Sequence, residues 1–228
     1  TQLGSIATSP VVVAASPADA GGLAAAGPWA RALNGSRSLA LLHPDRSAVG
    51  LLALRAVADT AGANPSAALA ATVHAVTLDG SATSTAAIQA VRRTGRNSTR
   101  IAVVSEQTLV NAQAGWSAAE LVPVYPQPGS PVLDYPLTRV SDARWTPPQE
   151  AGATLVVRAL TGEAAAEALR AAGFRSKDGA ISGTGPVQVP ERVEPLPLPG
   201  REDFEAVGAM LRELAPPTRM LAVLDVSM

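Results

Sequence analysis

The chain of 228 residues contains no cysteine. This absence excludes disulfide bonds, thiolate metal sites and cysteine nucleophiles. Aromatic residues are also scarce, with two tyrosines and two phenylalanines, so we expect no platform on which nucleic-acid bases stack. Charged residues make up 16% of the chain and the formal net charge is −1, without the clustered lysine and arginine of a nucleic-acid footprint. We therefore expect no nucleic-acid partner.

The sequence shows no signal peptide. The apolar stretch 11–15 is too short to cross a bilayer, and no basic segment precedes it. The chain begins at Thr1 without a methionine, so we expect a fragment or a processed product. Its length and its 47% hydrophobic content are enough for one sizeable domain, or for two small lobes that each have a core.

Hydrophobic periodicity predicts strands and helices in alternation. Strands are expected at 11–15, 38–43, 100–104, 121–125, 137–140 and 220–226. Helices are expected at 17–33, 49–61, 65–74, 83–93, 107–114, 149–160, 162–172 and 203–214. This alternation favours an α/β fold in which helices flank a parallel or mixed sheet.

Small hydroxyl residues lie beside two of the predicted strands. Ser5, Thr8 and Ser9 precede the strand 11–15, and they indicate either an ordinary polar turn or a segment that wraps a polar ligand. Ser47 stands where a helix begins after the strand 38–43. In open α/β sheets ligands gather at such strand ends, where free helix amides and a partial positive charge are available. Asp45 or Ser47 can equally cap that helix.

Three further polar side chains are candidates for the same kind of site. Ser105 and Glu106 follow the strand 100–104, where polar residues tend to face a crevice, although Glu106 can also serve as a favourable charge at a helix start. Tyr125 and Tyr135, each followed by proline, bracket a segment rich in proline and glycine. Each tyrosine is either a ligand contact or the anchor of a hinge.

No catalytic motif stands out along the chain. A Ser/His/Asp arrangement, a carboxylate pair and a Walker-type glycine loop are all missing at recognisable spacing. His43 and His74 have no second metal ligand at helical spacing, and we interpret both as structural. We therefore predict that the protein is not an enzyme and assign no catalytic residue.

The end of the chain has a short metal-binding pattern. An apolar strand at 221–224 is followed by Asp225 and Ser227, which is how a metal-ion-dependent adhesion site begins. Hard oxygen ligands of this kind suit Mg²⁺. Two residues do not hold the ion alone, because its other ligands come from later loops. We expect no cofactor in the present chain, and Mg²⁺ only in a complete domain of this type.

Short motifs occur in a fixed order over nearly the whole chain. They are 4–13 (GSIATSPVVV), 105–107 (SEQ), 124–126 (VYP), 134–136 (DYP), 173–175 (GFR), 178–179 (DG) and 221–227 (LAVLDVS). In this order they resemble actinobacterial-type extracellular solute-binding proteins that carry a von Willebrand factor A domain at their carboxyl end.

The resemblance implies a two-lobed, periplasmic-binding-protein-like fold of type II, with mixed sheets flanked by helices. Residues 1–136 would form a hinge crossing and the second lobe, and 137–178 would return to the first lobe. Residues 179–200 would be a proline-rich linker, and 201–228 the helix and first strand of a truncated A domain. The first lobe is expected to be incomplete, because the family's long amino-terminal segment is missing.

The resemblance also implies a function. A small polar solute would be captured between the lobes without catalysis, near Thr8, Ser9, Ser47, Ser105 and Tyr125. Hydroxyls and helix-start amides would hold the solute, and the low charge argues against a strongly ionic one. The protein would act at the cell surface or outside the cell with an ABC transporter, with any membrane anchor outside this chain.

The sequence is also compatible with a second function. In this alternative the fold is a spacer in an adhesion or interaction module, and the Mg²⁺-dependent A domain binds a protein partner. A deep crevice at Ser47 and Ser105 would favour solute capture. A filled crevice beside an exposed apolar surface would favour the interaction module.

Overall fold

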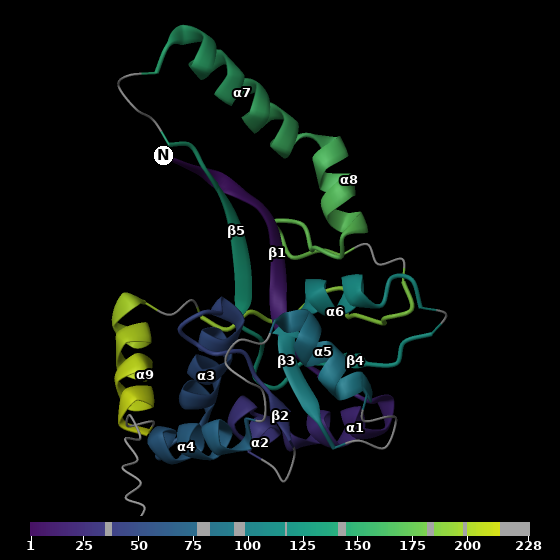
Figure 1. The fold of residues 1–228 in the computed structure, drawn as a ribbon, viewed down its shortest axis with the longest axis vertical. Helices are drawn as coiled ribbons and strands as arrows, with labels where there is room; N and C mark the ends of the chain where they lie inside the picture. The colour runs from purple at the N-terminus through teal and green to yellow at the C-terminus, as the bar shows by residue number, and fades with distance from the viewer. Residues whose placement is uncertain are drawn as a thin grey trace, which may run out of the picture.

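The computed structural model describes residues 1–34, 38–76, 83–93, 99–116, 118–140, 145–181, 185–197 and 200–214. Its strands are β1 (Gln2–Ala15), β2 (Leu39–Ala40), β3 (Ile101–Ser105), β4 (Val122–Val124) and β5 (Val132–Thr138). Its helices are α1 (Pro17–Ala26), α2 (Trp29–Leu33), α3 (Ala48–Thr60), α4 (Pro65–Ala75), α5 (Ser84–Arg93), α6 (Glu106–Ala112), α7 (Pro147–Thr161), α8 (Glu163–Ala171) and α9 (Arg201–Leu214). A mixed sheet is flanked by helices, which confirms the predicted fold class (Figure 1).

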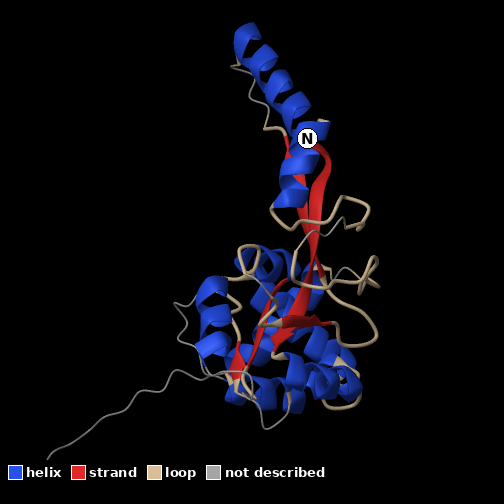
Figure 2. Ribbon diagram, turned by 90° about the vertical axis from the view of Figure 1, so that its right-hand side faces the viewer, coloured by secondary structure: helices blue, strands red, loops and turns tan. Residues whose placement is uncertain are grey.

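Strand β1 runs through both parts of the molecule. Its second half lies between β3 and β4 and is antiparallel to both, with Val12 opposite Val104 and Val13 opposite Val124. Its first half pairs with β5 as a two-stranded ribbon (Figure 2). The ribbon rises out of the lower lobe, which we define as the second half of β1 with β2, β3, β4, α1 to α6 and α9. Strand β2 extends the sheet in parallel beside β3. Within β1 the sequence predicts a strand only at 11–15. Residues 2–10 lack a periodic apolar pattern, and their strand depends on pairing with a distant segment.

The core of the lower lobe lies on both faces of the sheet. Val11 and Val13 join the larger cluster, to which α1, α2, α3, α4 and α9 contribute. Val12 and Ala14 point to the other face, where α5 and α6 cover them. Successive side chains of a strand alternate between faces, so a strand covered on both faces is apolar throughout. This explains the continuous apolar run at 11–15.

The single helix expected at 17–33 is two helices. Gly27 has φ +79°, a conformation that glycine adopts easily, and it ends α1. Pro28 follows as the residue that precedes α2. The break turns Trp29 into the core, where its indole N–H donates to the carbonyl of Gly129 (2.8 Å).

Helix α3 begins very close to the end of β2. A Cβ at Gly50 would overlap the backbone carbonyl of Leu42, closer than real Cβ atoms come to a neighbour. Glycine at this position therefore lets the first turn of α3 approach the chain that leaves β2. The contact fixes the start of the helix at the carboxyl edge of the sheet.

The upper part of the molecule consists of the β1–β5 ribbon, α7 and α8 (Figure 1). Neither α7 nor α8 buries a residue. Among the described residues, the large hydrophobic side chains that are exposed all belong to this part: Leu3, Val140, Leu155, Val156 and Leu160. The described upper part therefore lacks a core comparable to that of the lower lobe.

The chain after α8 first pairs with the β1–β5 ribbon and then returns to the lower lobe. Thr8 and Arg175 exchange two backbone hydrogen bonds (3.1 and 3.0 Å). Further on, the backbone N–H of Ser130 donates to the carbonyl of Glu194, and the backbone N–H of Leu196 donates to the carbonyl of Ser130 (both 2.9 Å). The proline-rich segment 185–197 therefore runs along the lower lobe. Helix α9 then packs on α3 and α4, with Val207 in the core. The predicted division into 1–136, 137–178, 179–200 and 201–228 remains a prediction, and the strand expected at 220–226 lies outside the described residues.

Candidate functional site

Two helices begin at the carboxyl edge of β2 and β3. The Ser47 hydroxyl accepts the backbone N–H of Gly50 (3.3 Å) and caps α3. The Ser105 hydroxyl accepts the backbone N–H of Thr108 (3.2 Å) and caps α6. Because β2 and β3 are parallel, both starts lie at the same edge, where open α/β sheets bind ligands. Ser47 thus fulfils the capping role that its sequence position allowed.

The hydroxyls of β1 reach the neighbouring segments. Ser9 is fully buried, and its hydroxyl accepts the backbone N–H of Gln107 in α6 (3.0 Å). Thr8 is partly exposed, and its hydroxyl donates to the carbonyl of Ser176 (2.9 Å). The segment 5–10 is thus neither a turn nor an open loop. It is a strand whose hydroxyl side chains form hydrogen bonds with α6 and with the chain that follows α8.

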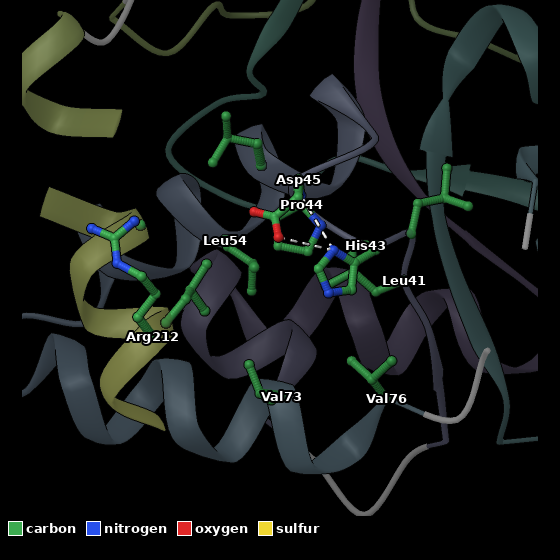
Figure 3. A pocket seen from close by; sticks show the side chains of 12 residues that line it. Leu41, His43, Pro44, Asp45, Leu54, Val73, Val76 and Arg212 are labelled. Atoms are coloured by element: carbon green, nitrogen blue, oxygen red, sulfur yellow. Dashed lines mark hydrogen bonds and ion pairs between the residues drawn. The ribbon is translucent and has the colours of Figure 1, made fainter. Parts of the chain in front are cut away.

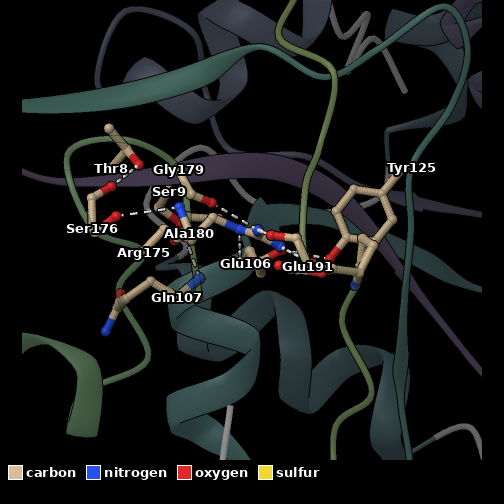
Figure 4. Close-up of polar contacts among 12 residues, drawn as sticks. Thr8, Ser9, Glu106, Gln107, Tyr125, Arg175, Ser176, Gly179, Ala180 and Glu191 are labelled. Atoms are coloured by element: carbon tan, nitrogen blue, oxygen red, sulfur yellow. Dashed lines mark hydrogen bonds and ion pairs between the residues drawn. The ribbon is translucent and has the colours of Figure 1, made fainter. Parts of the chain in front are cut away.

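Glu106 and Arg175 form the centre of this region (Figure 4). The guanidinium Nε donates to Oε1 of Glu106 and Nη2 donates to Oε2, both at 2.7 Å. The exposed fractions of the two side chains are 0% for Glu106 and 1% for Arg175. A carboxylate and a guanidinium in this two-point geometry give strong, directional hydrogen bonds.

The remaining donors of Arg175 bind backbone carbonyls. Nη1 donates to Gly179 and Glu191, each at 3.0 Å, and Nη2 also donates to Pro190 (2.9 Å). All five guanidinium N–H groups therefore have acceptors. The arginine ties α6 to the turn at 179 and to the extended segment at 190–191.

Tyr125 completes the cluster, since its hydroxyl donates to Oε2 of Glu106. Burial raises the pKa of Tyr125 far above its ordinary value, and the negative charge of Glu106 raises it further. Burial would lower the pKa of Arg175, but the hydrogen bond and charge of Glu106 outweigh this effect and the pKa is raised. At neutral pH the carboxylate therefore lies between two groups that keep their protons. This arrangement suits a structural clasp and not acid–base catalysis.

The predicted ligand residues thus fall into two groups. Thr8, Ser9, Ser105 and Tyr125 gather around the start of α6, whereas Ser47 lies at the start of α3. Ser9 and Ser105 are buried, with exposed fractions of 0% and 3%. Thr8, Ser47 and Tyr125 are partly exposed. Their contact with a solute remains a prediction.

Arg175 was not predicted as a site residue. It lies 69 residues from Glu106, so no local spacing connects the two. The signal available in the sequence was its setting between Gly173 and the Asp178–Gly179 pair, which indicates a turn in a chain with few charges. A turn does not reveal which buried carboxylate its arginine meets.

A cavity of about 490 Å³ lies between the chain that follows β2, helix α4 and helix α9 (Figure 3). Leucine and valine side chains form much of its wall, and His43, Asp45 and Arg212 supply polar groups. A second cavity, of about 770 Å³, lies along the β1–β5 ribbon and the segment 175–196. Charges of both signs line it, among them Asp134 and Arg192.

The described residues contain no group of three or more histidine, aspartate or glutamate side chains placed to hold a metal ion. Asp225 and Ser227 lie outside the described residues, so the Mg²⁺ prediction stays a prediction. Within the same described ranges, no helix is both long enough and apolar enough to cross a bilayer.

No family model and no curated protein sequence matches the chain. Among solved structures, it is similar to apo FutA2 from Synechocystis PCC6803, with a TM-score of 0.56 and 13% sequence identity. The match covers 92% of this chain and 70% of FutA2. FutA2 has a two-lobed, periplasmic-binding-protein-like fold. At this identity the likeness shows the fold alone, and the chain shares the periplasmic-binding-protein-like fold class.

Proposed function

We propose that the chain is the ligand-binding part of an extracellular solute-binding protein, which captures a small polar solute without catalysis. The observation that carries this proposal is the fold likeness to FutA2 over 92% of the chain. The β1–β5 ribbon connects the lower lobe to the region of α7 and α8, an arrangement that suits hinge closure around a solute (Figure 2). A role in supplying an ABC transporter, and an A domain beyond this chain, belong to the same proposal.

The solute site that we propose lies at the carboxyl edge of β2 and β3. Ser47 and the first backbone amides of α3 would donate hydrogen bonds to the solute. Thr8 and Tyr125, which are partly exposed, would lie at the border of the site. Buried Ser9 and Ser105 would act indirectly, by holding β1 and the start of α6. Neutral hydroxyls and amides favour a polar solute without strong charge.

A thermal-shift screen tests this proposal, using sugars, amino acids, oligopeptides and oxyanions. A solute that binds only the folded state raises the melting temperature by mass action. The informative variant is Ser47→Gly, because glycine replaces a serine cap at a cost of only about a few tenths of a kcal/mol. We expect this variant to show a smaller increase in melting temperature with the class of solute that binds the unaltered chain.

Ser16→Gly is the matched control. Ser16 also caps a helix, accepting the backbone N–H of Asp19 (3.3 Å), but it follows the carboxyl end of β1, at the opposite edge of the sheet. Its removal should leave the solute shift unchanged. A screen in which no class raises the melting temperature would overturn the proposal, and equal losses in both variants would overturn the placement at Ser47.

One observation favours the second candidate, an interaction module. Leu155, Val156 and Leu160 on α7 are exposed, and exposed apolar side chains that lie together commonly mark surfaces that bind other proteins. If a protein partner binds here, a Leu155→Glu variant should lose that partner while keeping any solute shift. The two candidates are therefore separable in one set of variants.

A further inference from the structure

The cavity beneath α9 has the walls of an apolar binding site (Figure 3). Leu41 and Leu54 belong to the buried core, and Val73 and Val76 reach the cavity from α4 and its carboxyl end. Leu211 closes the side formed by α9. A volume of about 490 Å³ is within the range of sites that hold small molecules. An aliphatic chain would remove these side chains from water.

His43 brings a hydrogen-bond donor to this cavity. Its Nδ1 accepts the backbone N–H of Asp45 (3.3 Å). A neutral ring whose Nδ1 is an acceptor carries its proton on Nε2, which is then the donor. The Asp45 carboxylate lies 3.6 Å from the same Nδ1, so the wall of the cavity at His43 also carries a negative charge.

Arg212 supplies a positive charge across the cavity from His43 (Figure 3). No described carboxylate lies within ion-pair distance of it, in contrast to Arg201 on the same helix, which pairs with Glu205 (2.8 Å). A guanidinium beside an apolar cavity favours a ligand that has an anionic head and an apolar body. Arg212 would then bind the head, and the leucines and valines would contact the body.

We propose that this cavity binds an aliphatic carboxylate, with its carboxylate on Arg212 and its chain against Leu54, Val73 and Leu211. Ser47 does not line this cavity, and the proposal does not rest on the solute site. Because Leu211 and Arg212 belong to α9, a bound ligand would join α9 to α3 and α4. Ligand binding would thus hold α9 on the lobe.

Calorimetric titration of the whole chain with butyrate, octanoate and laurate tests the apolar part of the site. We expect octanoate to bind more tightly than butyrate, because a longer chain removes more apolar surface from water. The variant Val73→Phe, which fills the cavity from α4, should abolish octanoate binding. Its melting temperature verifies that it folds. Equal affinity for butyrate and octanoate, no binding of any carboxylate, or octanoate binding retained in folded Val73→Phe would overturn the proposal.

Head-group recognition is tested with octanol and octylamine in place of octanoate. Both should bind more weakly than octanoate. Arg212→Gln should weaken octanoate binding by about tenfold and leave octanol binding unchanged, because only the anionic head loses a charged partner. Arg201→Gln is the matched control on the same helix and should bind octanoate as the unaltered chain does. Octanol binding as tight as octanoate binding, or no effect of Arg212→Gln, would show that no carboxylate site exists here.

Discussion

Arg175 and Glu106 form a two-point ion pair across 69 residues, with both side chains almost completely shielded from solvent. The pair lies where the returning chain meets the start of α6. Removing one partner from such a pair leaves a buried charge without compensation, which is far more costly than the loss of a surface pair. This relationship makes the stability of the lower lobe depend on a segment that the sequence presents as a loop.

We expect Arg175→Met to lower the free energy of unfolding by about 3–5 kcal/mol, because Glu106 is left buried and unpaired. Urea unfolding at neutral pH measures the change. The control is Arg158→Met on the exposed surface of α7, which should stay within about 0.5 kcal/mol.

Combining Arg175→Met with Glu106→Leu in a double-mutant cycle measures the direct interaction between the two side chains. The double variant should lose clearly less stability than the sum of the single variants, because no unpaired charge remains. Strict additivity would contradict a direct interaction.

Tyr125→Phe removes the hydrogen bond to the Glu106 carboxylate. A hydrogen bond to a charged group contributes about 1.5–3 kcal/mol, so we expect a loss of this size at neutral pH. Urea or guanidinium unfolding checks the value. An unchanged free energy of unfolding would mean that the hydrogen bond from the Tyr125 phenol does not stabilise the buried Glu106 carboxylate.

The same residue predicts a dependence on alkaline pH. Because folding raises the pKa of Tyr125, its contribution to stability is fully present below the ordinary tyrosine value of about 10 and is lost as the pH rises through the folded-state pKa. Stability should therefore fall above about pH 10, and Tyr125→Phe should flatten that fall. Tyr135→Phe is the control, since burial alone raises the pKa of Tyr135. If both variants flatten the fall equally, the Glu106 contact is not its cause.

The sequence predicted the elements of the lower lobe where local patterns determine them. The continuous apolar run 11–15 predicts a buried strand, and in the structure helices cover both of its faces. Ser47 was proposed as a cap, and its hydroxyl does accept an N–H of α3. Such features depend on residues close in sequence, so periodicity and capping residues reveal them.

Features that depend on distant partners were not predictable in the same way. The polar residues 2–10 form a strand only because β5, more than a hundred residues later, pairs with them. The hydrogen bonds to the Glu106 carboxylate likewise come from Arg175 and Tyr125, which lie in separate segments of the chain. A lone charge or phenol has no periodic pattern, and its partner is set by the tertiary fold.

Gly50→Ala tests the close approach of α3 to the end of β2. The added Cβ would overlap the Leu42 carbonyl, which is backbone and cannot turn aside, so we expect a loss of about 1–3 kcal/mol. Gly152→Ala in α7 is the matched control. A Cβ added there would have no atom within 4 Å, and alanine should favour the helix by up to about 1 kcal/mol. Thermal unfolding of both variants distinguishes a packing effect from helix propensity.

Helix α9 should stay on the lobe through apolar contact and not through its ion pair. Val207 is fully buried in the core, whereas Asp203 is partly exposed and lies 3.2 Å from Arg55. Val207→Asp would bury a charge without a partner, and we expect it to release α9 and make the helix susceptible to trypsin. Asp203→Asn removes a surface pair that contributes about 0–1 kcal/mol and should leave the cleavage pattern unchanged. Equal protection of α9 in both variants would mean that contacts other than Val207 hold the helix, while release by Asp203→Asn alone would assign that role to the ion pair.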